Sequence, residues 1–424
     1  MPTRVLVFPS CNEPGLEVID ALRRHPRIEV FGAAGIPAET DPSVVVLGRG
    51  RRFELPFLMA ENFESRLRAL CVELEIDLVF PTMDAVVATL ASLEEGPAYI
   101  GPSAEMATLC LSKSAVYRRV ESQVSVPRAF GELDTLPAFA KPDTGSGSRG
   151  ASVISSAEAL ESARTKGLLV QELLPGPEFT VDCLGTSAGD LVACSPRQRV
   201  TVAGGIARAA TCVVRPDLRA HCEFIQRTLK LNGPWFAQFK EDRDGLPRLM
   251  EVNARVGGSS GLSRLAGVNI PLMAVLQATG VKLSEPRRLD GITLARKLDR
   301  TGQLDDFDWV VWDLDDTLLH TGDVVDPDAI ATLFRLDQRG KSQLLLSRNV
   351  DPAAAVRRSK IPNLFVEILR TEDKVASMLK LQAKYGLELS RTLMINDSGA
   401  ERIRFEREMP EVRTIGPDAL GVLG

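Results

Sequence analysis

The sequence contains little histidine and no closely spaced pair of cysteines. Its three histidines, His25, His221 and His320, are too few for a histidine-rich metal centre. The seven cysteines include no C-x-x-C pair and their number is odd, so reduced thiols are favoured over a disulfide framework or a zinc site. No segment reaches the roughly 18 apolar residues of a membrane-spanning helix, and the N-terminus MPTRVLVFPS lacks a signal-peptide run. We therefore expect a soluble, cytoplasmic protein without a membrane partner.

The sequence also lacks an excess of positive charge. Its net charge is −5, which argues against a nucleic-acid backbone as the main partner. The basic run 49–52 is short, and a solvated loop is the simpler interpretation. Hydrophobic residues make up 44% and charged residues 25%, an ordinary globular balance. A chain of 424 residues is too long for one hydrophobic core, so we expect two or three domains.

The first hundred residues alternate between strand and helix signals. Buried strands are expected at 5–9, 28–31, 44–47 and 77–80, and helices at 16–24, 61–75 and 84–93. This alternation predicts an α/β domain with a parallel, doubly wound sheet, whose ligands lie beyond the carboxyl ends of the strands. The residues expected there are Ser10, Asn12, Glu13, Thr82 and Asp84. Capping of turns and helices explains Asn12 and Asp84 equally well.

The middle of the chain has a different pattern, with longer antiparallel strand signals between helices over 101–283. The stretch 282–308 is rich in proline, glycine and charge, and after it strands and helices alternate again. We therefore predict three domains, at 1–100, 101–290 and 305–424, with α+β architecture in the second and a Rossmann-like sheet in the third.

Two segments of the middle region suit a nucleotide. In AFAKPDTGSGSRGASVI, Lys141 precedes a glycine-rich loop, whose backbone amides can approach phosphate oxygens closely. In VQELLPGPEFTVD, a strand passes through a Pro-Gly turn into another strand, and such a linker can present backbone groups to adenine. Taken singly, the first is equally a mobile hairpin and the second a surface connection.

A third segment, FAQFKEDRDGLPRLMEVNAR, carries an oxygen-rich set. Glu251 and Asn253 are two apart on a strand and share a face, with Gln238 on the partner strand. Carboxylate and amide oxygens suit magnesium, and Arg255 can hold a transferred phosphoryl group. A glutamate buried beside Asn and Arg is hard to explain as part of a hydrophobic core, because burying an unpaired charge there is costly. Lys113 begins a further helix and, taken by itself, is a surface lysine.

The order of these segments resembles the ATP-grasp superfamily, in its carboxylate–amine ligase and carbamoyl-phosphate-synthetase-like branch, over roughly residues 1–290. The resemblance implies ATP and Mg²⁺ as cofactors, and Arg255 facing an acyl phosphate. The implied nucleotide contacts are Lys113, Lys141, Ser146, Gly147, Ser148, Glu172, Glu178 and Arg199. The implied magnesium ligands are Gln238, Glu251 and Asn253.

The C-terminal region opens with WVVWDLDDTLL, a strand followed by crowded carboxylates. Asp313 suits a nucleophile that forms an aspartyl-phosphate, and Asp315 suits a proton shuttle. Ser347 and Asp397 each follow a later buried strand, and Lys374 begins a helix. Each of these last three would by itself be an ordinary surface residue.

Together they resemble the haloacid dehalogenase superfamily, in its capless, FkbH-like group, over about 308–420. The resemblance implies Asp313, Asp315, Ser347 and Lys374 as catalytic residues, with magnesium at Asp313, Asp315 and Asp397. The pair Asn396-Asp397 departs from the two acidic residues of many relatives. The intervals from Asp313 to Ser347 (347 − 313 = 34) and from there to Lys374 (374 − 347 = 27) leave no room for a cap domain.

These resemblances imply a bifunctional enzyme, an ADP-forming carboxylate–amine ligase joined to a magnesium-dependent phosphatase. A grasp-type small-molecule kinase is the alternative, and a nucleotide sensor controlling the phosphatase is a third. The expected partners are small carboxylates and amines, free or carrier-bound, and a homodimer is left open.

Overall fold

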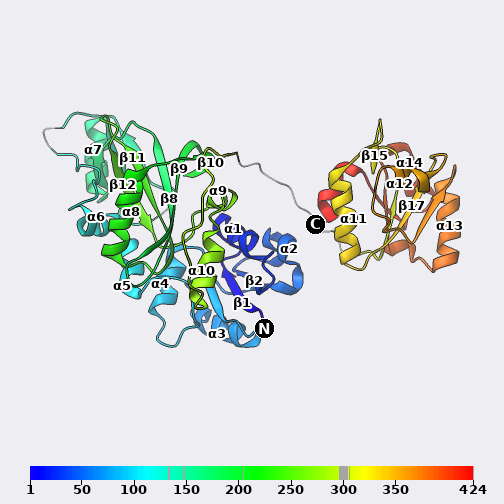
Figure 1. Ribbon diagram of the computed structural model, residues 1–424, viewed down its shortest axis with the longest axis horizontal. Coiled ribbons are helices and arrows are strands. Elements are labelled where there is room, and N and C mark those ends of the chain that lie inside the picture. The colour runs from blue at the N-terminus through cyan, green and yellow to red at the C-terminus, as the bar shows by residue number, and fades with distance from the viewer. Residues whose placement is uncertain are drawn as a thin grey trace. The chain divides into compact units, whose positions relative to one another are not determined.

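The computed structural model describes residues 1–131, 134–145, 147, 149–203, 205–295, 304 and 306–423, without the side chain of Ile206. The chain divides into two compact units, 1–298 and 299–424, each described below by itself. Both have the mixed α/β architecture that was expected (Figure 1). The predicted boundary near residue 100 lies inside the first unit and stays a prediction. No described helix is long and apolar enough to cross a membrane.

The N-terminal part of the first unit is a four-stranded parallel sheet of order β3-β2-β1-β4. Its strands are β1 (Thr3–Phe8), β2 (Ile28–Ala34), β3 (Arg52–Glu54) and β4 (Leu78–Pro81), and its helices are α1 (Glu13–Leu22), α2 (Ser43–Leu47), α3 (Phe63–Glu73) and α4 (Asp84–Ser92). Apolar clusters cover both faces of the sheet, as near-continuous apolar strands require.

Two local expectations here are wrong. The segment 44–47 is not a strand but part of the short helix α2, which ends at Gly48 with a left-handed φ of 78°. The basic run 49–52 is not entirely solvated either. Arg52 lies on β3, and its fully buried side chain donates from Nε to Oδ2 of Asp41 at 2.7 Å.

Replacement of Asp41 by alanine should lower the free energy of unfolding by about 3–5 kcal/mol, because the Arg52 guanidinium would stay buried without its charged partner. Both side chains are 0% exposed. The matched control is Glu64→Ala, which breaks a partly exposed i,i+4 pair with Arg68 and should cost under about 0.5 kcal/mol. Urea unfolding followed by circular dichroism measures both. Equal losses in the two variants would contradict the buried pair's role.

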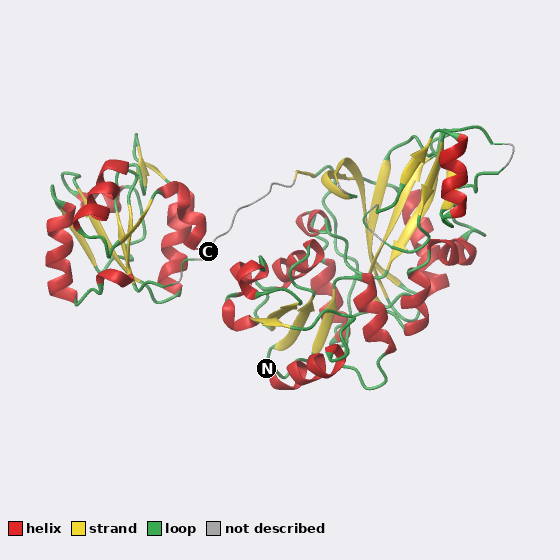
Figure 2. Cartoon of the chain, turned by 180° about the vertical axis from the view of Figure 1, so that it is seen from behind, coloured by secondary structure: helices red, strands yellow, loops and turns green. Residues whose placement is uncertain are grey.

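The rest of the first unit is built on two antiparallel sheets (Figure 2). The three-stranded sheet has the order β6-β5-β7, with β5 (Ala138–Lys141), β6 (Ser152–Ile154) and β7 (Leu169–Glu172). The six-stranded sheet has the order β12-β11-β8-β9-β10-β13, with β8 (Glu178–Gly185), β9 (Leu191–Ala203), β10 (Ile206–Cys212), β11 (Gly233–Glu241), β12 (Pro247–Asn253) and β13 (Thr293–Ala295). The helices are α5 (Ala104–Cys110), α6 (Lys113–Val120), α7 (Ala157–Thr165), α8 (Pro216–Leu229), α9 (Gly261–Leu265) and α10 (Ile270–Ala278).

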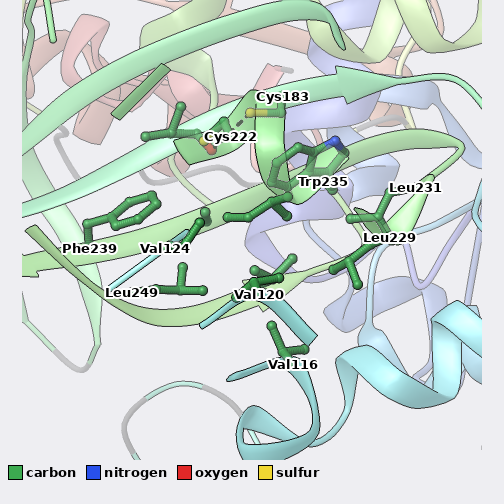
Figure 3. Close-up of a cluster of buried hydrophobic side chains, with 14 of the residues drawn as sticks. Val116, Val120, Val124, Cys183, Cys222, Leu229, Leu231, Trp235, Phe239 and Leu249 are labelled. Atoms are coloured by element: carbon green, nitrogen blue, oxygen red, sulfur yellow. Dashed lines mark hydrogen bonds between the residues drawn. The ribbon is translucent and has the colours of Figure 1, made fainter. Parts of the chain in front are cut away.

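Side chains alternate along the six-stranded sheet, so its two faces differ. On β8, Phe179, Val181 and Cys183 belong to an apolar cluster that includes residues of α6 and α8 (Figure 3). The intervening polar residues of β8 point to the opposite face. That polar face is where predicted nucleotide and magnesium contacts such as Glu178, Arg199 and Gln238 gather.

The second unit is built on a five-stranded parallel sheet of order β18-β17-β14-β19-β20. Its strands are β14 (Trp309–Trp312), β17 (Ser342–Ser347), β18 (Glu367–Arg370), β19 (Thr392–Ile395) and β20 (Arg413–Ile415), beside a hairpin of β15 (Leu319–His320) and β16 (Val324–Val325). Its helices are α11 (Pro327–Gln338), α12 (Pro352–Arg358), α13 (Lys374–Tyr385) and α14 (Gly399–Glu408). Between β14 and β17, a fully described stretch, the chain carries only this hairpin and α11.

Candidate functional site

A cavity of about 880 Å³ lies within the first unit. Ten predicted nucleotide, magnesium and phosphoryl residues line it: Lys113, Lys141, Gly147, Glu172, Glu178, Arg199, Gln238, Glu251, Asn253 and Arg255. Ser146 and Ser148, also predicted to contact the nucleotide, lie outside the described residues. From the N-terminal sheet, Asn12, Glu13, Thr82 and Asp84 line the same cavity, whereas Ser10 is fully buried and hydrogen-bonds to Asp41 and Ser43.

Lys141 is a buried cation of this cavity and is only 6% exposed. Its Nζ donates to the hydroxyl of Tyr117 at 3.0 Å and to the carbonyl of Met250 at 2.9 Å. Within the described part of the chain no carboxylate lies within 4.0 Å of that nitrogen. Burial lowers the pKa of Lys141 to about 8. A buried ammonium whose near partners are all neutral fits an anionic ligand such as a phosphate.

The start of α6 holds the glycine-rich loop in place. Lys113 Nζ donates to the carbonyls of Gly145 at 2.9 Å and Asp143 at 3.3 Å. The Asp143 carboxylate in turn accepts from Ser112 Oγ and from the backbone N–H of Ser114. Gly145 and Gly147 have φ of 104° and 71°, which favour glycine and let the loop turn its amides toward a ligand. Lys113 therefore positions the loop as well as adding charge.

The oxygen set on β11 and β12 faces the cavity together. Gln238 is the direct cross-strand partner of Glu251, and Asn253 lies two residues further along β12. All three line the cavity, and the buried Asn253 amide has a nitrogen without a hydrogen-bond partner. A carboxylate with two amide oxygens, beside space for phosphates, fits Mg²⁺.

Buried donors without acceptors gather on the same cavity. They are Arg197 Nη1, Arg199 Nε, Asn253 Nδ2 and Gln171 Nε2. Leaving a buried donor unsatisfied costs about 1–3 kcal/mol, so several donors lining one cavity point to an acceptor-rich ligand there. Arg197 was missed from sequence, although the R-x-R spacing places it beside Arg199 on one face of β9.

Ion pairs fix the two arginines of β9. Arg199 pairs with Glu178, so these two predicted nucleotide contacts, on neighbouring strands, engage each other. Arg197 pairs with Asp182 at 2.7 Å, and that carboxylate also accepts from Ser263 Oγ at 2.6 Å. These contacts orient the guanidinium groups before any ligand binds, which reduces the ordering cost of binding.

Arg255 and Glu172 are each held by a contact that sequence did not predict. Arg255 Nε donates to Oδ2 of Asp84 at 2.8 Å, so Asp84 ties the N-terminal sheet to the end of β12 rather than only capping α4. The Arg255 guanidinium also lies 5.3 Å from the ring centroid of Phe236. Glu172 accepts the backbone N–H of Arg128 at 2.8 Å, close to the adenine linker that was expected.

Nucleotide binding should weaken as the pH rises through about 8, because Lys141 then loses its charge. The lowered pKa means that the ammonium form is present below this value and lost above it, so the Kd of a non-hydrolysable ATP analogue should rise by up to tenfold per pH unit between pH 8 and 10. Isothermal titration calorimetry measures this. Arginine does not titrate over this range. The Kd of any binding that remains in Lys141→Arg should therefore not change with pH between 8 and 10. A flat profile in the native protein would contradict the assignment.

The second unit gathers its predicted residues at the carboxyl ends of parallel strands. Asp313, after β14, is 6% exposed and accepts from Lys374 Nζ at 2.6 Å. The same ammonium lies 2.8 Å from Oε2 of Glu401. Burial raises the pKa of Asp313 to about 6, against the charge and hydrogen bond of Lys374, and the charge of Asp397 adds to the rise. Asp313 therefore forms a buried ion pair with Lys374.

Asp315 is exposed and held by two side chains of the next loop. Ser347 Oγ donates to its Oδ2 at 3.2 Å, and Asn349 Nδ2 donates to its Oδ1 at 3.0 Å. Asn349 was not predicted from sequence. Asp397 is exposed after β19, and its backbone N–H donates to Thr317 Oγ1 at 3.2 Å. Five predicted residues thus meet at one edge of the sheet, with three carboxylates that suit magnesium.

Comparisons with known proteins concern mainly the first unit. A family described as ATP-grasp in the biosynthetic pathway with Ter operon matches residues 164–298. The formate-dependent phosphoribosylglycinamide formyltransferase of Bifidobacterium adolescentis is 27% identical over an alignment of 193 residues, which covers 38% of this chain and 48% of that protein. The chain thus spans about half of this relative's length.

Solved structures share the fold at low identity. N5-carboxyaminoimidazole synthetase from Staphylococcus aureus, complexed with ADP, superposes with a TM-score of 0.56 at 14% identity, covering 70% of this chain and 82% of that one. A second structure is the biotin carboxylase domain dimer of Hydrogenobacter thermophilus 2-oxoglutarate carboxylase, complexed with MgADP and bicarbonate. It superposes with a TM-score of 0.54 at 18% sequence identity, covering 67% of this chain and 72% of that one. Part of the chain thus matches an ATP-grasp family model, and these solved structures share its fold at low identity.

Proposed function

We propose that the first unit is an ADP-forming ligase that joins a carboxylate to an amine through an acyl phosphate. The observation that carries the proposal is the set of buried, unpaired donors of Arg197, Arg199, Asn253 and Gln171, which line the same cavity as Lys141 and Glu251. Such a lining favours a ligand rich in anionic oxygens. The order of the matching residues along the chain agrees with an ATP-grasp site.

Each side chain then has a definite task. Lys141 and the loop held by Lys113 would bind the phosphates, and Glu251, Asn253 and Gln238 would hold magnesium, which would supply positive charge to the transferring phosphoryl group. Arg255, pre-oriented by Asp84, faces the acyl phosphate, and Arg199 is a further phosphate or substrate contact. Glu172 and Glu178 remain the candidates for the adenine and ribose ends. Because these groups are fixed by existing contacts, they need little reorganisation during the reaction.

We further propose that the second unit is a magnesium-dependent phosphatase. Asp313 attacks the phosphorus of a phosphomonoester and becomes an aspartyl-phosphate, while Asp315 gives its proton to the leaving alcohol. Asp315 then takes a proton from the water that attacks the phosphorus of this acyl phosphate, which releases inorganic phosphate and regenerates the Asp313 carboxylate. Ser347 and Lys374 bind the phosphoryl oxygens, and Asp397 completes the magnesium ligands. The family match ends at residue 298, so it does not cover this unit. The phosphatase proposal is supported by the convergence of these side chains at one edge of the sheet.

The decisive test is ADP release by the purified chain with mixtures of small carboxylic acids and amines. A ligase should form ADP only when an acid and an amine are both present, in step with an amide product and free phosphate. A kinase would instead retain the phosphate on its product, and a sensor would bind ATP without sustained turnover. Steady ADP release with one substrate and no amide would overturn the ligase proposal.

A further inference from the structure

Three of the seven cysteines converge on the apolar side of the six-stranded sheet, opposite the nucleotide cavity. Cys183 on β8 and Cys194 on β9 are direct cross-strand partners, and Cys222 comes from α8, which covers this face. Their sulfur atoms all lie within 4.8 Å of one another. Figure 3 shows Cys183 and Cys222 among the apolar side chains of this cluster. Neither the ligase nor the phosphatase chemistry uses them.

The spacing of the three sulfurs is close to that of a three-coordinate site. Bonds of about 2.3 Å to one three-coordinate centre place the three sulfurs about 3.5–4 Å apart, the shorter value for a pyramidal centre. Because the sulfurs lie within 4.8 Å of one another, each needs to move by about 1 Å or less toward a common centre. In the described part of the chain no histidine, aspartate or glutamate joins this group, so its ligands are sulfur alone. A pure sulfur set selects soft, thiophilic ions.

Burial restricts the charge that this site tolerates. Cys183 and Cys222 are 0% exposed and Cys194 is 7% exposed. Three thiolates around a divalent ion leave one net negative charge, which is costly among apolar side chains. Three thiolates around a trivalent centre are neutral. The surroundings therefore favour a trivalent, thiophilic metalloid over Zn²⁺ or Cd²⁺.

We propose that Cys183, Cys194 and Cys222 form a three-sulfur site for a trivalent metalloid of the arsenite class. Arsenous acid, As(OH)₃, reacts with three thiols to give one neutral As(S)₃ group and three waters. Three As–O and three S–H bonds break, three As–S and three O–H bonds form, and arsenic remains trivalent throughout. Cys194, at the rim of the cluster, is the first point of attack. The product links β8 and β9 to α8.

The test uses the reduced full-length chain, equilibrated with sodium arsenite and then desalted. We expect one arsenic per chain by elemental analysis and intact mass, and a higher melting temperature of the first unit, because the bridge binds only the folded arrangement. Cys222→Ala and Cys194→Ala should each lose the retained arsenic and the thermal shift. Cys194→Ala removes the least buried member, so it guards against failure of the Cys222 variant to fold.

The matched control is Cys212→Ala, since Cys212 is equally buried on β10 but lies outside the cluster. It should retain arsenic like the native chain. CdCl₂ is the second probe, and its Kd should be at least tenfold weaker than that of arsenite. Retention of arsenic in the Cys194 and Cys222 variants, its absence from the native chain, or tighter binding of cadmium than of arsenite would each overturn the proposal.

Discussion

Replacement of Glu251 by glutamine should reduce ATP-dependent product formation by about a thousandfold or more, while phosphatase activity is unchanged. The change keeps the shape of the side chain but removes the only carboxylate of the set formed with Gln238 and Asn253. Loss of metal-assisted charge stabilisation is worth several kcal/mol, and each 1.36 kcal/mol is a factor of ten in rate. The measurement is ADP release by the acid and amine pair that supports turnover.

The matched control for Glu251→Gln is Glu241→Gln. Glu241 lies at the end of the neighbouring strand β11, pairs with Arg215 and does not line the cavity. It should therefore retain ADP release within a few-fold of the native rate. If both variants lost ADP release equally, the effect would belong to the sheet and not to a metal ligand. Loss of both activities in folded Glu251→Gln would contradict the division of labour between the units.

The parts of the fold that sequence predicted are those with a strong local pattern. Alternating strands and helices predicted both parallel sheets because apolar periodicity and short connections determine that arrangement. The segment 44–47 was misassigned because β-branched valines favour a strand, and here tertiary context overrides that propensity. Arg52 was misassigned because its burial depends on Asp41, eleven residues earlier, and no local pattern reports such a pairing.

The same distinction applies to the site. Glu251, Asn253 and Gln238 were legible because two residues on one strand and a partner across a hairpin share a face. Tyr117, which holds Lys141, comes from a helix 24 residues earlier in the chain. Asn349, which holds Asp315, follows a different strand from the one before its partner. Supporting contacts of this kind come from the packing of separate elements, so a single sequence does not reveal them.

The three-cysteine cluster shows that cysteines without close spacing in the sequence can still lie together in the folded chain. No C-x-x-C pair marks these residues, and spacing alone favoured scattered thiols. Hairpin register brings Cys183 beside Cys194, and packing of α8 adds Cys222. Ligand-spacing rules detect metal sites within one loop or helix. They do not detect sites assembled from the interior faces of three elements.

Replacement of Asp313 by asparagine should reduce phosphatase activity by about 10⁴-fold or more, while ADP release by the first unit continues. The amide nitrogen cannot attack phosphorus, so the aspartyl-phosphate is not formed, and removal of a nucleophile typically costs several orders of magnitude. Hydrolysis of an aryl phosphate with Mg²⁺ measures the loss. The native enzyme should also show acid-labile phosphate on the protein after rapid quenching, and the variant should show none.

The matched control for Asp313→Asn is Asp316→Asn, three residues further in the same loop. Asp316 is exposed and has a φ of 55°, a conformation that asparagine adopts readily. This variant should keep phosphatase activity within a few-fold. An equal loss in both variants would indicate that the loop needs net negative charge, for magnesium, and not a nucleophile at 313. Retention of the quenched phosphate adduct in Asp313→Asn would move the nucleophile to another carboxylate, with exposed Asp315 the nearest candidate along the loop.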